Sequence, residues 1–173
     1  MGQYYKPCII ITKSGLAGVV AWLSARSYGS GVKQMEHSYL DDRFVAAFEW
    51  LISSEGPHHK SQVVWAGDYG DVEEGYEVNL YELCTSDLHA TPEGTGFSYP
   101  IIANHTKKQF LDKNEVVGEI HPLPLLTMET AGGGGGDYRG INEHFLGIWA
   151  RDVISLEKVA PEDYQKVSFE FKE

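Results

Sequence analysis

One segment of this 173-residue chain carries the hydrophobic period of an α-helix, and the segments around it do not. Within positions 41–53, apolar side chains recur at i, i+1, i+4, i+7 and i+8, which places them on one stripe of a helix. These residues are Phe44, Val45, Phe48, Leu51 and Ile52. Ser38 or Asp41 can cap its start, and Pro57 lies just beyond its end. The pattern predicts one main amphipathic helix at about 41–53.

The segments on either side of this helix are short, rich in β-branched or aromatic residues, and bounded by turn residues. A hairpin is predicted from positions 3–12 and 18–27, with a turn at Ser14 and Gly15. Further strands are predicted at positions 62–66, 116–120, 145–150 and 167–171, and positions 72–84 fit a short helix or a strand pair. The sequence therefore predicts an α+β fold in one compact domain over positions 1–173, with a mostly antiparallel sheet and long glycine-rich loops.

The charge of the chain limits its partners. It has 14 Lys and Arg against 25 Asp and Glu, a net charge of −11 at pH 7. A protein that coats nucleic acid needs a basic face to neutralise phosphates, so the acidic balance argues against that class. A few local donors can still bind one small anionic ligand, because net charge acts mainly at a distance.

Nothing in the sequence indicates export or a membrane partner. The longest apolar stretch, Leu16 to Leu23, is far shorter than the ~20 residues that span a bilayer. No basic and then apolar leader opens the chain. Cys8 and Cys84 lie in apolar contexts, which favours buried free thiols over a bridge. We therefore expect a cytoplasmic protein, within the host cytoplasm if it is encoded by a phage.

The densest polar cluster is the segment 104–109, between two apolar pairs. It supplies an amide, an imidazole, a hydroxyl and two ammonium groups, which suit a phosphate and a sugar or base edge. These candidate ligand-binding residues are Asn104, His105, Thr106, Lys107 and Lys108. The same cluster is also compatible with a solvated turn between strands. The residues are kept as candidates because so basic a patch is rare in this acidic chain.

A run of five glycines, positions 132–136, precedes Asp137, Tyr138 and Arg139. Successive backbone amides can form a nest for an anion, and the guanidinium adds further donors. No lysine and serine of a phosphate-binding loop follow the glycines, so a flexible surface loop is the alternative. A related tripeptide, Gly67-Asp68-Tyr69, directly follows the predicted strand 62–66 and fits a simple Asx turn. In these two Gly-Asp-Tyr motifs, Tyr69 and Tyr138 are the candidates for stacking on a base.

Motifs for catalysis and metal binding are missing. The seven histidines are scattered, and neither HExxH, CxxC nor Gly-x-Ser-x-Gly occurs. The sequence therefore predicts no metal site and no cofactor. An enzyme, a small hydrolase or transferase, remains an alternative, with His105 or His37 acting beside Asp68 or Asp137. A third possibility is an acidic interaction or inhibitor module, although the acidic residues are spread along the chain.

Several phrases of the sequence together resemble a family of small phage and bacterial proteins that open with MGQYY. The phrases lie at positions 1–7, 33–39, 65–69, 104–109, 137–138 and 149–152. The resemblance implies no catalytic residue, because no activity is established for that family. A phage setting suggests a counter-defence protein that sequesters a cyclic-nucleotide signal.

The leading prediction is a non-catalytic binding protein for a small phosphorylated ligand, most simply a nucleotide. It depends on a cationic, glycine-lined pocket within an anionic protein. A homo-oligomer is compatible with it, because a site shared between protomers is common in small domains.

Overall fold

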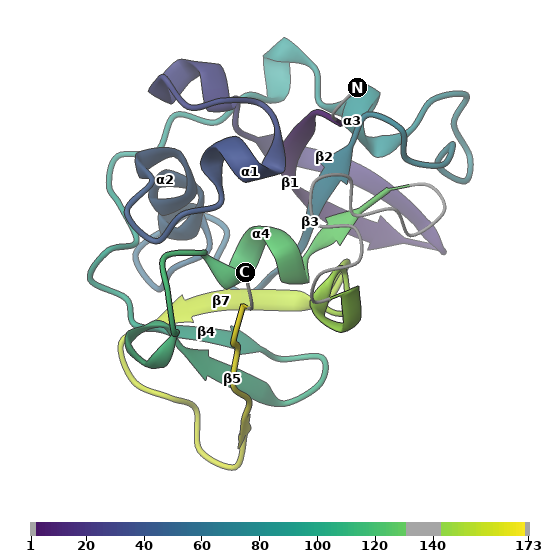
Figure 1. Cartoon of the computed structure of the whole chain (residues 1–173). Helices are drawn as coiled ribbons and strands as arrows, with labels where there is room; N and C mark the ends of the chain where they lie inside the picture. Colours follow the sequence, from purple (N-terminus) through teal and green to yellow (C-terminus); the bar gives the residue numbers. More distant parts are fainter. Residues whose placement is uncertain (1–2, 131–142, 172–173) are drawn as a thin grey trace.

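The structure, a computed structural model, describes residues 3–130 and 143–171 (Figure 1). The described chain is an α+β fold with a mixed, mostly antiparallel sheet of eight strands and four α-helices, which confirms the predicted class. The strands are β1 (Tyr5–Lys13), β2 (Leu16–Trp22), β3 (Ser61–Gly67), β4 (Ile101–Asn104), β5 (Gln109–Asp112), β6 (Met128–Glu129), β7 (Val153–Glu157) and β8 (Gln165–Lys166). The helices are α1 (Gln34–His37), α2 (Arg43–Leu51), α3 (Leu80–Leu83) and α4 (Pro122–Leu126).

The strands follow the order β2-β1-β3-β7-β4-β5-β8, and β6 pairs with β3 beside this path. The two parallel pairs are β3 with β6 and β5 with β8. The predicted hairpin is β1 and β2, whose turn residues Ser14 and Gly15 adopt φ of 53° and 78°. Strands β3 and β7 pair only through two residues each, so the sheet has two parts joined at a narrow ladder.

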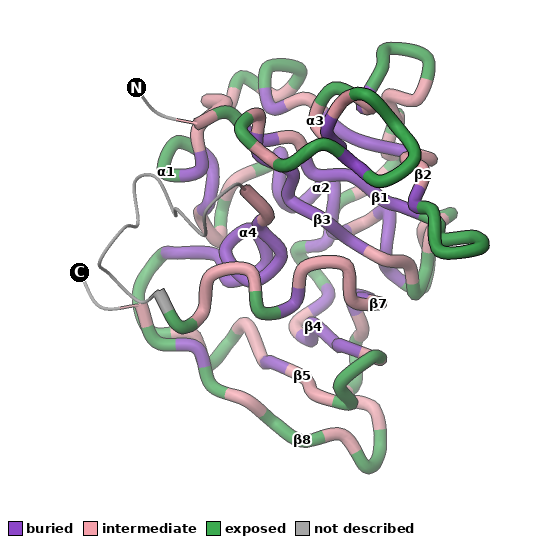
Figure 2. The backbone as a smooth tube through the Cα atoms, turned by 90° about the vertical axis from the view of Figure 1, so that its right-hand side faces the viewer, coloured by how far each residue is buried: buried purple, intermediate pink, exposed green. Residues whose placement is uncertain are grey.

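Alternate side chains of β1 and β3 face two different cores, as the two-residue period of a strand requires. Ile9 and Trp65 face the larger core, against which α2 and α4 pack. Ile10 and Val64 face a smaller core, which is closed by α3. The middle of β1 and most of β3 and α4 are therefore buried (Figure 2).

Helix α2 lies inside the predicted segment 41–53, but its surroundings differ from the prediction. Its N-cap is Asp42, whose Oδ1 accepts the backbone N–H of Phe44 at 2.8 Å and of Val45 at 3.3 Å. Seven of its nine residues are buried. The helix is thus enclosed on most sides rather than along one stripe, because loops cover the side that an isolated amphipathic helix would leave open.

The segment Ala90–Gly96, called the strap below, covers part of that side. The Gly96 N–H donates to the Ala46 carbonyl at 2.7 Å. A Cβ at position 96 would lie 2.3 Å from Glu49 Cβ, and one at Gly94 would lie 2.5 Å from Trp50 Nε1. Glycine is needed at both positions because the strap runs in direct contact with α2.

The strand predicted at 145–150 is wrong. This segment forms a one-turn 3₁₀ helix over Glu143–Phe145 and then turns, and Gly147 has φ of 72°. The Gly147 N–H donates to the Leu125 carbonyl at 2.8 Å, so the segment packs on α4 instead of joining the sheet. The strand lies further on, at β7.

The strands predicted at 116–120 and 167–171 are also absent from the described sheet, apart from isolated bridges. Val117 pairs with Glu170 alone, and Ile120 with Tyr39 alone. Phe169 is nevertheless buried in the larger core. Alternating apolar residues here reflect burial of side chains rather than continuous strand pairing.

Both cysteines are buried and free, which confirms the prediction for Cys8 and Cys84. Among the described helices, none is long and apolar enough to cross a bilayer.

Candidate functional site

The predicted basic cluster forms the turn between β4 and β5, and the protein uses much of it internally. Asn104 is fully buried; its amide donates to Asp152 Oδ2 at 2.8 Å, and its oxygen accepts the Lys107 N–H at 2.9 Å. The Lys107 ammonium pairs with the same carboxylate and also reaches the Ile148 carbonyl at 2.9 Å. The charge of Lys107 is therefore already balanced by Asp152. Exposed Lys108, at φ 53°, has no carboxylate partner within the described chain.

Two other residues of this turn are held by β7 and by the loop that follows it. Thr106 Oγ1 accepts the Val153 N–H at 2.9 Å. The His105 ring lies between the Tyr164 hydroxyl, 2.8 Å from Nδ1, and Ser155 Oγ, 2.7 Å from Nε2. Both ring nitrogens are occupied, so His105 has a structural role in the turn.

The contacts of His105 continue as a chain of hydrogen bonds. Ser155 Oγ donates to Glu157 Oε1 at 2.7 Å, and the same oxygen lies 2.6 Å from His59 Nε2. Because Ser155 has one proton, it accepts from His105 Nε2, and His105 Nδ1 accepts from Tyr164. A serine beside a histidine resembles a catalytic pair, but Ser155 is fully buried and no substrate can reach its oxygen.

Electrostatics keep His105 neutral. Burial lowers its pKa, and the nearby Lys60 ammonium lowers it further, although Glu157 acts in the opposite direction. Lys60 was not among the sequence candidates, because 45 positions separate it from His105. The neighbourhood thus holds several basic groups, but none of the described hollows is lined by them.

The structure does not bring Tyr69 to this turn. Gln62 of β3 pairs with Val153, next to the turn, whereas Tyr69 lies beyond the opposite end of β3. Five residues of extended chain, from Gln62 to the end of β3 at Gly67, separate the two ends, or about 17 Å along the strand. The side chain of Tyr69 is exposed there, and the preceding Asp68 accepts the Tyr4 N–H at 3.1 Å in a structural turn. Asp137, Tyr138 and Arg139 of the predicted glycine-rich site lie outside the described residues.

His37, an alternative catalytic residue, is a core residue with no exposed surface. The Trp65 indole donates to its Nε2 at 2.9 Å, so the proton is on Nδ1, which donates to the Gly31 carbonyl at 2.8 Å. Burial lowers the pKa of His37. Since both nitrogens are bonded inside the core, His37 cannot act on a substrate.

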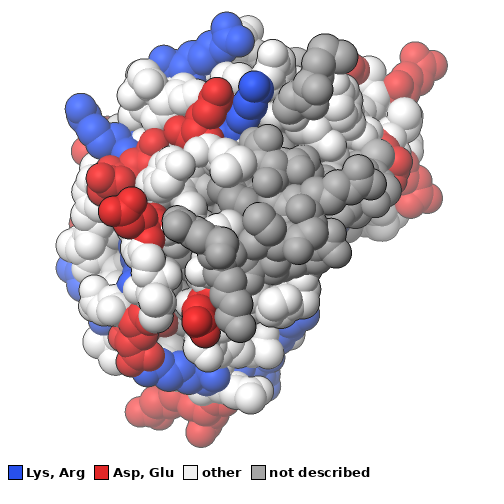
Figure 3. Space-filling view, viewed as in Figure 1, with Lys and Arg blue, Asp and Glu red and all other residues white. Residues whose placement is uncertain are grey.

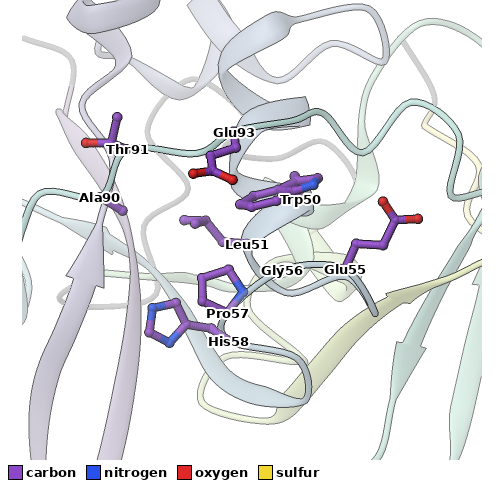
Figure 4. Close-up of a pocket in the computed structure, with 9 residues that line it drawn as sticks. All are labelled: Trp50, Leu51, Glu55, Gly56, Pro57, His58, Ala90, Thr91 and Glu93. Carbon is purple, nitrogen blue, oxygen red and sulfur yellow. The ribbon is translucent and has the colours of Figure 1, made fainter.

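A hollow of about 370 Å³ lies beside α2, where the sequence indicated no site. Its floor is Trp50 and Leu51, on the side of α2 next to the strap (Figure 4). Thr91 and Glu93 of the strap also line the hollow, and the Glu93 carboxylate is directed towards Trp50 and Leu51 (Figure 4). The turn after α2 supplies the opposite wall, Glu55, Gly56, Pro57 and His58. We call this hollow the Trp50 pocket; its volume lies within the usual range for small ligands.

The Trp50 pocket has two acidic lining residues, Glu93 and Glu55, of which Glu55 is paired with Lys158. The Tyr99 hydroxyl and the Lys158 ammonium hold the pKa of Glu55 below its ordinary value, so this carboxylate is ionised at neutral pH. Lys158 Nζ lies 3.3 Å from Glu55 Oε1, and both side chains are well exposed. Burial lowers the pKa of His58, which keeps its ring neutral. The lining therefore offers acceptor oxygens beside a flat aromatic surface.

The face of the molecule in Figure 3 shows no extended basic patch among its described residues. Acidic and basic side chains alternate there (Figure 3). Within the described residues, no group of three or more His, Cys, Asp or Glu side chains is arranged to hold a metal ion.

Sequence reasoning missed Trp50, Glu55, His58 and Glu93. Trp50 falls off the apolar stripe that predicted the helix, and an aromatic residue off the stripe is a signal of a second contact. Gly94 and Gly96 opposite it gave a second signal, since glycine permits close approach of the backbone. Neither signal says which two segments meet.

Comparison with protein-family models, with curated proteins and with solved structures gave no match. The resemblance to phage proteins that open with MGQYY stays a prediction.

Proposed function

We propose that this protein binds a nucleotide, with the base in the Trp50 pocket. The observation that carries this proposal is the pairing of a partly exposed indole with the Glu93 carboxylate in one hollow of about 370 Å³ (Figure 4). Bases stack on aromatic rings and are recognised by hydrogen bonds to their edges. Stacking on tryptophan contributes roughly 1–3 kcal/mol per base.

The acceptor-rich lining selects bases with exocyclic amino groups. The Glu93 carboxylate can accept hydrogen bonds from such groups, and uracil lacks one. Guanine presents two adjacent donors, which suit one carboxylate in a bidentate pair. We therefore expect guanine, adenine and cytosine nucleotides to bind more tightly than uridine nucleotides.

The phosphate of this ligand belongs outside the carboxylate-lined part of the pocket. The proposed site therefore lies beside α2 and not at the predicted β4–β5 turn. At that turn, Asn104, His105 and Lys107 are engaged within the protein. Binding without turnover would correspond to sequestration of a nucleotide signal, the role that the phage resemblance suggests.

Calorimetry with GMP, AMP, CMP and UMP tests the proposal. We expect heat with the first three, and roughly tenfold weaker binding or none with UMP. Trp50→Ala and Glu93→Gln should each weaken binding, while Tyr76→Ala and Glu74→Gln, at exposed positions outside the pocket, should not. The proposal is wrong if no nucleotide gives heat, or if the two pairs of variants behave alike.

Chromatography of the same mixtures distinguishes binding from catalysis. A binding protein leaves each nucleotide unchanged, whereas a hydrolase or transferase produces new species. New products that disappear in Glu93→Gln would replace the binding proposal with an enzymatic one at the same pocket.

A further inference from the structure

A second hollow, of about 220 Å³, adjoins the Trp50 pocket. The two share Glu93 and are separated by the strap, and both are bounded by α2. Arg43, Ala47, Trp50 and Leu51 stand at i, i+4, i+7 and i+8 of that helix, so one stripe of α2 runs along both hollows. We call the second hollow the Arg43 pocket.

The Arg43 guanidinium is the basic group of this second pocket. The side chain is exposed, and no carboxylate of residues 3–130 and 143–171 forms an ion pair with it. The adjacent Asp42 is engaged as the N-cap of α2 and also accepts the Ser30 hydroxyl at 3.1 Å. The charge of Arg43 is thus available to a ligand, in contrast to that of Lys107.

Two residues with side-chain hydroxyl groups belong to the lining of the Arg43 pocket. Tyr28 and Thr95 line the same pocket. Partial burial raises the pKa of Tyr28, so its hydroxyl keeps its proton at neutral pH. A guanidinium beside neutral hydroxyl donors is a set that binds phosphate, because arginine forms paired, charge-assisted hydrogen bonds with phosphate oxygens.

The spacing of the two pockets fits one extended ligand. Seven residues separate Arg43 from Trp50, which is about 10 Å along the helix axis. The long arginine side chain can shorten this span. A nucleoside diphosphate, or a dinucleotide with its phosphate away from the stacked base, has a comparable length. The Glu93 carboxylate turns towards Trp50 (Figure 4), so it faces the base rather than the phosphate.

We infer that the Arg43 pocket is the phosphate subsite of this protein, with Arg43 as the anchoring residue. The inference rests on the proposed function, since it takes the base to lie on Trp50. It identifies the ligand class as a nucleotide whose phosphate extends across the strap, and it predicts that phosphate raises affinity through one guanidinium.

Calorimetry with guanosine and GDP, on the natural protein and on Arg43→Gln, tests this inference. GDP should bind at least about tenfold more tightly than guanosine, as expected for hydrogen bonds to a charged group. Arg43→Gln should remove that advantage and leave guanosine binding unchanged. Arg26→Gln, an exposed arginine outside both pockets, is the matched control and should keep the full advantage.

The outcomes separate the two proposals. If guanosine does not bind, the base pocket is wrong and the phosphate subsite with it. If guanosine binds and GDP binds equally well, the base pocket stands and the subsite is overturned. An advantage of GDP that survives Arg43→Gln also overturns it, because the phosphate would then bind elsewhere. A weaker salt dependence of GDP affinity in Arg43→Gln than in Arg26→Gln supports the subsite.

Discussion

Glu49 of α2 is almost fully buried, and its charge is balanced mainly by Lys113. The Lys113 ammonium lies 2.6 Å from Glu49 Oε2, and the exposed fractions of the two side chains are 11% and 1%. It also donates to the Gly96 carbonyl at 3.2 Å, which fastens the end of the strap to α2. Lys113→Met would leave a carboxylate in the core without its cation.

The remaining neighbour of Glu49 cannot replace Lys113. His121 Nε2 lies 3.2 Å from Glu49 Oε1, and its Nδ1 accepts the Leu123 N–H at 3.1 Å. Nδ1 of His121 is thus occupied by a backbone N–H, and the ring offers a single N–H on the side of Glu49. Breaking a buried ion pair from one side costs roughly 3–5 kcal/mol of unfolding free energy.

Urea denaturation measures this loss. With a slope of about 2 kcal/mol per molar urea, Lys113→Met should lower the midpoint by roughly 2 M. Glu49→Gln combined with Lys113→Met should recover part of the loss, because no unpaired charge remains. Lys158→Met is the control, since its pair with Glu55 is exposed on both sides and contributes little to stability. If Lys113→Met and Lys158→Met cost the same, the reasoning about burial is refuted.

Three other predictions concern the core around α2. Because burial lowers the pKa of His37, the unfolded chain binds the proton more readily; urea midpoints should therefore fall as pH drops from about 6.5, and less steeply in His37→Gln. Asp42→Ala removes the N-cap and should cost about 1–2 kcal/mol by the same assay, whereas Asp41→Ala should cost little. Phe48→Ala opens a cavity beside Trp65, 5.2 Å away between ring centres, and should cost roughly 3–5 kcal/mol; a loss under about 1 kcal/mol would contradict the packing.

The fold class, the first hairpin and the position of α2 could be predicted because each follows from local period and turn residues. The strand predictions failed where side chains are buried although the backbone of the segment does not pair continuously in the sheet. Phe169 alternates with polar neighbours and enters the core, yet its segment makes only an isolated bridge in the described sheet. Positions 145–150 are apolar because they pack on α4, and Gly147 turns the chain there. The hydrophobic period of a segment indicates which of its side chains are buried. Whether its backbone pairs with another strand depends on tertiary contacts.

The charges of the candidate site show the same limit of prediction from local sequence. The segment 104–108 stood out because basic residues are rare in this chain, but Asp152, which balances Lys107, lies 45 positions away. Local composition counts charges without their distant partners. Arg43 did not stand out at all, although the structure leaves its guanidinium without an ion-pair partner among the described residues. Whether a cation is available to a ligand is decided by the fold rather than by its frequency in a segment.

The two pockets beside α2 exist because the strap carries no side chain at positions 94 and 96 and can therefore lie close to the helix. A side chain at position 94 would meet the Trp50 indole, and one at position 96 would meet Glu49, so larger residues would push the strap outward. Moving it would carry Glu93 away from Trp50 and merge the two hollows. The proposed division of the ligand, with the base on one side and the phosphate on the other, therefore depends on these two glycines, of which Gly94 also lines the Arg43 pocket. The expected consequence is that Gly94→Ala weakens the binding of guanosine and GDP together, whereas Arg43→Gln affects GDP alone.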